Sequence, residues 1–177
     1  MEVEKQYVMI CDIDNCYTDS REWYKVLPKD IGNNRELWDE FQSKVNLVKP
    51  NKPVINLCVA TVEILPVVFL TGREDRHDHR EDTIKQIEEF SEGKIKINND
   101  NRLIMRKEFD YRPSEIIKNE MLVGVVKEGL IPICAIDDEV QNCELYKRYN
   151  IPTVLYKIDT NEFVKFHKPT VKTQWED

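Results

Sequence analysis

Acidic side chains follow two short apolar runs of the chain, at the point where each run ends. Asp12 and Asp14 come directly after the run YVMIC, and Asp137 and Asp138 come directly after ICAI. If the apolar runs are neighbouring strands of one sheet, the four carboxylates lie together at its rim. There they repel one another unless a cation lies among them. Because the donors are all oxygen atoms, the set favours a hard divalent ion, with magnesium as the first choice.

Hydroxyl and cationic side chains follow two other apolar runs. Thr71, Gly72 and Arg73 come after VVFL, and Arg106 and Lys107 come after LIM. Cations beside a magnesium site favour an anionic substrate, and phosphate is the simplest candidate. These residues therefore predict phosphate chemistry.

Five short apolar runs without polar alternation are typical of strands that are buried on both faces. The runs are YVMIC, VVFL, LIM, IPICAI and IPTVLYKI. Helical patterns lie between them, at Pro53 to Glu63, Glu81 to Ser91, from Pro113 onward, and Glu139 to Tyr149. This alternation predicts an α/β fold of three layers, with a mainly parallel sheet of five strands. Ligands bind beyond the carboxyl ends of such strands, so the chemical residues are expected on one rim.

Residues 15–52 interrupt this alternation of strands and helices and form a long segment of mixed polar and apolar residues. It contains Trp23, Tyr24, Trp38 and Phe41. We interpret it as a flap or small cap inserted after the first strand of a single domain, residues 1–177. Its aromatic residues are more typical of packing within a cap than of a base-stacking platform. The polar tail, residues 159–177, is expected to be an edge hairpin or a loose end.

Composition excludes several classes of protein. The chain has 177 residues and a net charge of -7, which argues against a long duplex-binding track on the surface. No apolar run reaches membrane-spanning length, and the polar opening residues do not resemble a signal peptide. The five cysteines are odd in number and lack C-x-x-C pairing. We therefore expect reduced thiols in a cytoplasmic protein.

The ordered motifs resemble those of phosphatases of the haloacid dehalogenase (HAD) superfamily. Asp12-Ile13-Asp14 matches the D-x-D motif, and Thr71 matches the second motif. Lys118 lies where the motif lysine is expected, in the helix after Arg112-Pro113, and Asp137-Asp138 matches the fourth motif. A lone D-x-D is a weak signal, but four motifs in the right order over residues 12–138 are a strong one.

The match looks closest to the phosphatase half of bacteriophage polynucleotide kinase-phosphatase and to related small phage or bacterial phosphatases. The segments FLTGRED, IMRKEFDYRPSEIIKNEML and AIDDEVQNCELYKRYNI carry this resemblance. Asn15 and Cys16 depart from it, because the family often has Gly-Thr after D-x-D. The sequence contains no G-x-x-x-x-G-K-[ST] loop, so no kinase half is expected in it.

The resemblance implies a role for each catalytic residue. Asp12 would attack phosphorus and form an aspartyl-phosphate. Asp14 would protonate the leaving oxygen and later deprotonate the hydrolytic water. Thr71 and Lys118 would hold the phosphoryl oxygens.

The resemblance also implies a magnesium site, formed by Asp12, the backbone carbonyl of Asp14, and the acidic pair. Asp138 is expected to be the direct ligand of that pair. Asp137 would then orient Lys118 or a water molecule on the metal.

The substrate is the least determined part of the hypothesis. Gly72, Arg73, Arg106 and Arg112 are the candidate substrate-binding residues. The resemblance implies a 3′-phosphate at the end of a polynucleotide. The alternatives are a phosphatase for free nucleotides, or one for a sugar phosphate or another metabolite. A phospho-receiver signalling domain is a remote alternative. The acidic pair of a receiver follows the first strand, whereas Asp137-Asp138 follows a late one.

Overall fold

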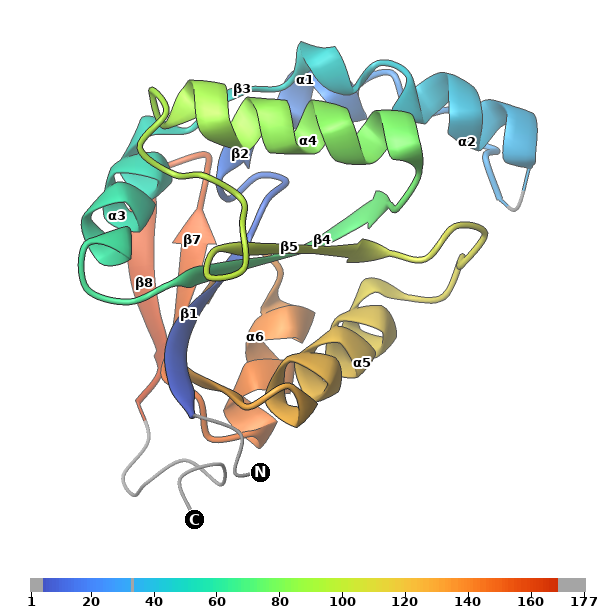
Figure 1. Ribbon diagram of the computed structural model, residues 1–177. Coiled ribbons are helices and arrows are strands. Elements are labelled where there is room, and N and C mark those ends of the chain that lie inside the picture. The colour runs from blue at the N-terminus through green and yellow to red at the C-terminus, as the bar shows by residue number, and fades with distance from the viewer. Residues whose placement is uncertain (1–4, 33, 169–177) are drawn as a thin grey trace.

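A six-stranded sheet forms the centre of the computed structural model, which describes residues 5–32 and 34–168 (Figure 1). Its strands are β1 (Gln6–Asp12), β4 (Val67–Glu74), β5 (Arg102–Arg106), β6 (Leu130–Asp137), β7 (Thr153–Lys157) and β8 (Glu162–His167). Their order across the sheet is β5-β4-β1-β6-β7-β8. The first five are parallel, and β8 pairs antiparallel with β7. The predicted α/β class and its five parallel strands are confirmed, and the sheet has a sixth strand in addition.

β1 lies at the centre of the sheet, between β4 and β6. Asp12 at its end pairs with Leu70 of β4, and Cys11 pairs with Ile136 of β6. Because all three strands run in the same direction, the residues that follow their carboxyl ends share one rim. This is the arrangement that the acidic motifs require.

The sixth strand, β8, has no apolar run that could have predicted it. Its side chains are exposed or half-buried along its whole length, as suits an edge strand in water. It forms the edge hairpin that was one of the two expectations for the polar tail. Residues 169–177 of that tail lie outside the described residues.

Helices cover both faces of the sheet (Figure 1). One face carries α3 (Lys52–Val62) and α4 (His77–Phe90), and the other carries α5 (Ser114–Lys127) and α6 (Val140–Arg148). Successive side chains of β1 alternate between the two cores, with Cys11 on the α3 side and Ile10 on the α5 side. Both faces are therefore buried, which explains the continuous apolar runs. No helix among the described residues has the length and apolar character needed to cross a membrane.

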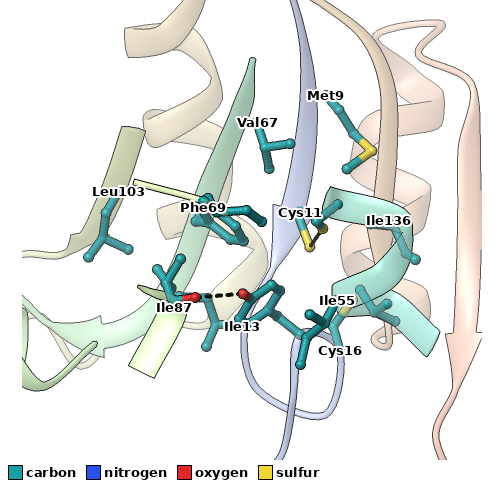
Figure 2. Close-up of a cluster of buried hydrophobic side chains, with 14 of the residues drawn as sticks. Met9, Cys11, Ile13, Cys16, Ile55, Val67, Phe69, Ile87, Leu103 and Ile136 are labelled. Atoms are coloured by element: carbon teal, nitrogen blue, oxygen red, sulfur yellow. Dashed lines mark hydrogen bonds between the residues drawn. The ribbon is translucent and has the colours of Figure 1, made fainter. Parts of the chain in front are cut away.

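The core beneath α3 and α4 also anchors the chain that leaves β1 (Figure 2). The Tyr17 hydroxyl donates a hydrogen bond of 2.8 Å to the backbone oxygen of Ile87 in α4. Its ring packs edge-on against Phe69 of β4, with ring centroids 5.1 Å apart. These contacts fix the start of the inserted segment relative to the sheet.

The inserted segment, residues 15–52, has a small core of its own. Its elements are β2 (Thr18–Asp19), α1 (Arg21–Tyr24), α2 (Arg35–Gln42), a 3-10 turn η1 (Val45–Leu47) and β3 (Lys49–Pro50). The rings of Trp23 and Phe41 stack in this core, 4.5 Å apart, and Val45 and Val48 pack beside them. The Trp23 indole N–H donates to the backbone oxygen of Phe41 at 2.9 Å.

An ion-pair network joins α2 to the main sheet. Arg35 donates to Glu74 at the end of β4, at 3.0 Å, and to Glu108 at 3.3 Å. It also pairs with Asp39 one turn further along α2, at 2.8 Å. Asp39 in turn pairs with Arg76, which precedes α4. We call Arg35, Asp39, Glu74, Arg76 and Glu108 the α2 network.

Candidate active site

A buried lysine joins the ends of two neighbouring strands. The Nζ atom of Lys118 lies 2.6 Å from Oδ1 of Asp12 and 2.7 Å from Oδ2 of Asp137. Asp12 ends β1 and Asp137 ends β6, and all three side chains are almost fully buried. Burial alone would lower the pKa of Lys118, but the two carboxylates raise it well above its ordinary value, so the ammonium stays charged.

Asp137 is held in place from several sides. Its Oδ1 accepts hydrogen bonds of 3.0 Å from the backbone N–H of Glu139 and from the Asn142 amide. Its Oδ2 accepts from Lys118 and, at 3.3 Å, from the Tyr146 hydroxyl. Both oxygens are thus occupied, which suits a residue that orients Lys118.

Three carboxylates gather at this point with one ammonium among them. Oxygen atoms of Asp12, Asp137 and Asp138 all lie within 4.8 Å of one another. Burial and the Asp137 charge raise the pKa of Asp138 to about 7. Burial also raises the pKa of Asp12, although Lys118 opposes it. A divalent cation would relieve this repulsion, and the all-oxygen donor set fits a hard ion such as Mg²⁺.

The carboxylate of Asp14 is bound by a buried arginine. Arg73 Nη2 lies 2.7 Å from Asp14 Oδ1, and Arg73 Nε lies 3.1 Å from both oxygens. The Ser20 hydroxyl donates to the same Oδ1 at 2.8 Å. On its other side, Arg73 donates to Gln86 at 2.7 Å and to Thr83 at 3.2 Å. The structure therefore brings Arg73 to Asp14 as its partner, and the arginine is only 2% exposed.

Thr71 and Gly72 take different places beside Arg73. Thr71 is fully buried, and its hydroxyl accepts a hydrogen bond of 3.2 Å from the backbone N–H of Arg73. Gly72 lines the cavity described below, where a Cβ atom would lie 3.3 Å from Nη2 of Arg106. A side chain at position 72 would therefore crowd Arg106.

The two remaining candidate arginines are separated by the structure. Arg106, at the end of β5, lines the cavity and donates to the backbone oxygen of Asp110 at 2.9 Å. Its buried Nε has no hydrogen-bond partner among the described residues. Arg112 lies outside the cavity, half-exposed, and pairs with Asp110 at 2.6 Å and Glu120 at 2.7 Å.

A cavity of about 300 Å³ opens over these groups. Its walls come from the sheet rim and from the inserted segment. It is lined by Asp12, Asp14, Asn15, Trp23, Tyr24, Leu27, Trp38, Phe41, Gln42, Gly72, Arg73, Arg106, Ser114, Lys118, Asp138 and Glu139. The acidic residues, two arginines and a lysine thus meet aromatic rings around one space.

A comparison with known protein families shows which family this chain belongs to. A family model described as the phosphatase domain of polynucleotide kinase PNKP (HAD_PNKP) matches residues 6–163. The chain belongs to this family. It is a HAD-type phosphatase, and the predicted relationship to the PNKP phosphatase is confirmed. No curated protein matches the sequence.

Solved structures share the fold of this PNKP-type phosphatase. A chain of the Pnkp1/Rnl/Hen1 RNA repair complex aligns with a TM-score of 0.62 at 21% identity, over 87% of this chain and 43% of that one. A second structure of the Pnkp1/Rnl/Hen1 complex gives 0.63 at 20% identity, over 87% and 47%. A HAD-superfamily hydrolase from Geobacter sulfurreducens PCA gives 0.51 at 14% identity, over 86% and 90%. The PNKP-type phosphatase thus spans less than half the length of the repair-complex chains it matches.

Three residues that support the site of the PNKP-type phosphatase were not predicted from its sequence. Ser20 binds Asp14, while Asn142 and Tyr146 bind Asp137. Asn142 and Tyr146 are four residues apart and lie on one face of α6, directly after the acidic pair. Their spacing could therefore have predicted that both contact this pair. No pattern in the sequence indicates a role for Ser20, because a loop brings it back to the D-x-D motif.

Proposed function

We propose that this chain hydrolyses phosphomonoesters with Mg²⁺, through a phosphate ester on Asp12, and that its substrate is the 3′-phosphate of a polynucleotide. The observation that carries the proposal is the convergence of Asp12, Asp14 and Lys118 on one cavity. One Asp12 oxygen is held by Lys118, and Oδ2 has no hydrogen-bond partner among the described residues. Oδ2 is therefore the atom that attacks phosphorus.

The two half-reactions use Asp14 in opposite directions. As the Asp12 oxygen bonds to phosphorus, the bond from phosphorus to the leaving oxygen breaks, and Asp14 gives that oxygen its proton. Water then attacks the aspartyl-phosphate, Asp14 takes the proton from the water, and phosphate and the Asp12 carboxylate are released. Arg73 and Ser20 crowd Oδ1 of Asp14, whereas among the described residues Oδ2 receives only the 3.1 Å contact from Arg73 Nε. Oδ2 is therefore the oxygen that carries the proton.

The metal and the cations divide the remaining tasks. Asp12, Asp138 and the Asp14 backbone carbonyl would hold Mg²⁺, with Asp137 nearby to orient Lys118. An ion bound there would neutralise charge on the phosphoryl oxygens. Lys118 stabilises the same charge from the side of the sheet. Arg106 lines the wall of the cavity that comes from the main sheet, so its guanidinium would face the substrate there.

A 3′-phosphorylated nucleic-acid end is favoured as substrate by membership of the PNKP phosphatase family. The net charge of -7 does not favour a long nucleic-acid track, but one chain end needs only one or two phosphate contacts. The cavity of about 300 Å³ also leaves a free nucleotide as the second candidate substrate.

The test compares kcat/KM on four substrates with Mg²⁺ present. These are a 3′-phosphorylated oligonucleotide, a 5′-phosphorylated one, and mononucleotide 3′- and 5′-phosphates. We expect the oligonucleotide 3′-end to be preferred by more than tenfold, or about 1.4 kcal/mol of transition-state stabilisation. Equal or faster cleavage of mononucleotides would sink the polynucleotide proposal.

Two variants tie the measured activity to the proposed site. Asp12→Asn should abolish it, because the amide keeps the shape of the side chain but loses the anionic nucleophile. Asp100→Asn, which changes an exposed aspartate in the loop before β5, should retain wild-type rates. Turnover by Asp12→Asn at the wild-type rate would contradict the mechanism. Full activity of the wild-type enzyme in excess chelator would contradict it as well.

A further inference from the structure

The four aromatic residues that line the cavity are not equivalent. Trp23 and Phe41 are 2% and 3% exposed, and they stack on each other. Trp38 is half-buried, and its indole N–H donates to the backbone oxygen of Gly32 at 2.7 Å. Tyr24 alone among the four is exposed, with 42% of its surface accessible. Three of the rings therefore build the inserted segment, and one remains available to a ligand.

Tyr24 is held at the cavity wall but not covered there. Its ring packs at a tilt against Trp23, with centroids 5.4 Å apart, and against Phe41 at 6.0 Å. No hydrogen bond of its hydroxyl is found among the described residues. Partial burial and the nearby carboxylates of Asp14 and Asp12 raise the pKa of Tyr24, so the hydroxyl stays neutral.

A short chain of contacts links Tyr24 to Asp14. The backbone N–H of Tyr24 donates to the backbone oxygen of Ser20 at 2.9 Å. The Ser20 hydroxyl in turn donates to Asp14 at 2.8 Å. In the proposed mechanism Asp14 protonates the leaving oxygen, so the leaving group must enter on this side of the cavity. Tyr24 is thus fixed beside the space that the leaving group occupies.

Gly72 and Arg106 lie on the wall of the same cavity that comes from the main sheet. Gly72 presents no side chain there, and the guanidinium of Arg106 lies beside it, with hydrogen bonds to the described residues from Nη1 and none from Nη2. The cavity therefore offers an aromatic face on the inserted segment and a cation with unused hydrogen-bonding capacity on the sheet. A flat ring joined to a polar sugar matches these two walls.

We propose that Tyr24 stacks on the base of the nucleoside that carries the scissile phosphate, with Arg106 facing its sugar and phosphate oxygens. This inference rests on the proposed function, because it takes the leaving group to be a nucleoside. Stacking on an aromatic ring is tolerant of base identity, since every base has a π face. The subsite therefore binds a terminal base without selecting one sequence.

The experiment removes the ring from the protein and the base from the substrate. The variants are Tyr24→Ala and Tyr24→Phe, with Tyr7→Ala as the matched control. Tyr7 is 52% exposed and lies near the start of β1, at the end of the strand away from the cavity. The two substrates are 3′-phosphorylated oligonucleotides of one sequence, whose terminal nucleotide either has its base or is abasic.

We expect Tyr24→Ala to lose about tenfold in kcat/KM on the substrate with a base, chiefly through a higher KM. On the abasic substrate, Tyr24→Ala and wild type should agree. Tyr24→Phe should behave like wild type, because the ring is retained, and Tyr7→Ala should not differ from wild type on either substrate. Equal losses on both substrates would show that Tyr24 only supports the inserted segment, and no loss on either would also overturn the proposal.

The proposal of a polynucleotide substrate can fail while the proposal for Tyr24 stands. If the wild-type enzyme cleaves mononucleotides as well as oligonucleotide ends, the same comparison is made between a nucleoside 3′-phosphate and ribose 3-phosphate. A loss by Tyr24→Ala on the nucleotide alone supports the stacking subsite in that case. Equal rates of Tyr24→Ala and wild type on both small substrates reject it.

Discussion

Arg73 carries a positive charge in a place from which water is almost excluded. Its side chain is 1% exposed, and its nitrogens donate to Asp14, Gln86 and Thr83. A buried guanidinium is stable only when a carboxylate and other acceptors surround it. Arg73 and Asp14 therefore depend on each other, and a residue of the proposed proton transfer is positioned by this pair.

Replacing Arg73 tests this dependence at the scale of one residue. Arg73→Ala leaves Asp14 without its cation, and we expect a loss of about 3–5 kcal/mol in the free energy of unfolding. Arg73→Lys keeps the charge but not the forked geometry, so it should fold better yet lose about 10²-fold or more in kcat, because Asp14 is no longer oriented for proton transfer. Denaturant unfolding and steady-state kinetics measure the two effects.

Arg102 provides the matched control for Arg73. It begins β5, at the end of the strand opposite Arg106, and pairs with Glu128. Arg102→Ala should cost about 0–1 kcal/mol and leave kcat unchanged. Equal destabilisation by Arg73→Ala and Arg102→Ala would contradict the interpretation of Arg73.

At the scale of elements, α2 is attached to the rest of the protein through charge as well as through apolar packing. Arg35 reaches Glu74, whose side chain is only 4% exposed, and also Glu108 in the loop after β5. Ions that are this far removed from water interact more strongly than exposed pairs. The position of α2 over the cavity therefore depends on the α2 network as well as on apolar packing.

Arg35→Ala should loosen α2 without unfolding the sheet. It leaves the buried Glu74 carboxylate without its cation, and we expect a loss of about 1–3 kcal/mol, with faster amide hydrogen exchange across residues 35–42 than across β1. Lys44→Ala, which removes an exposed pair with Glu40 in the same inserted segment, is the control and should cost about 0–1 kcal/mol. Unchanged exchange in α2 after Arg35→Ala would show that packing alone holds the helix.

The predictable part of the molecule consists of strand ends, and the unpredicted part consists of side-chain partners. Asp12 and Asp137 follow runs that are buried on both faces, so their place on one rim follows from the α/β alternation. Lys118 came only from the family resemblance, since lysines on helices are common. The Arg73–Asp14 pair was not predicted, because 59 residues separate the two and the sequence pattern does not show which way an arginine turns. The side chains of β8 lack the apolar run of the inner strands, so the sequence does not distinguish an edge hairpin from a loose end there.

At the scale of the whole molecule, the proposed metal site at the carboxylate cluster would couple metal binding to folding. In the metal-free protein, burial and Asp137 raise the pKa of Asp138 from 3.8 to about 7. The folded state then holds this proton more tightly than the unfolded state does. The contribution of Asp138 to stability is therefore complete at low pH, falls as pH rises from 3.8 to about 7, and is level above that.

Magnesium should reverse this trend, because at the proposed site it would bind only the deprotonated carboxylates of the folded protein. We expect the gain in Tm from Mg²⁺, relative to chelator, to be larger at about pH 8 than at about pH 5. Asp138→Asn should reduce both the gain and its dependence on pH. A gain that is the same at both pH values, or that survives in Asp138→Asn, would contradict a metal site at this cluster.

The central position of β1 has a consequence for how the chain is made. β1 is synthesised before both of its neighbours, because its partner residues lie in β4, from Val67, and in β6, from Leu130. Pairings between such distant segments form slowly, because a long loop must close before they stabilise anything. Until residue 137 has left the ribosome, β1 has at least one unpaired edge and Asp12 has no Asp137 beside it. Every nascent chain thus passes through a stage in which its central strand is open to wrong partners, and the candidate active site is assembled only after β6 has been made.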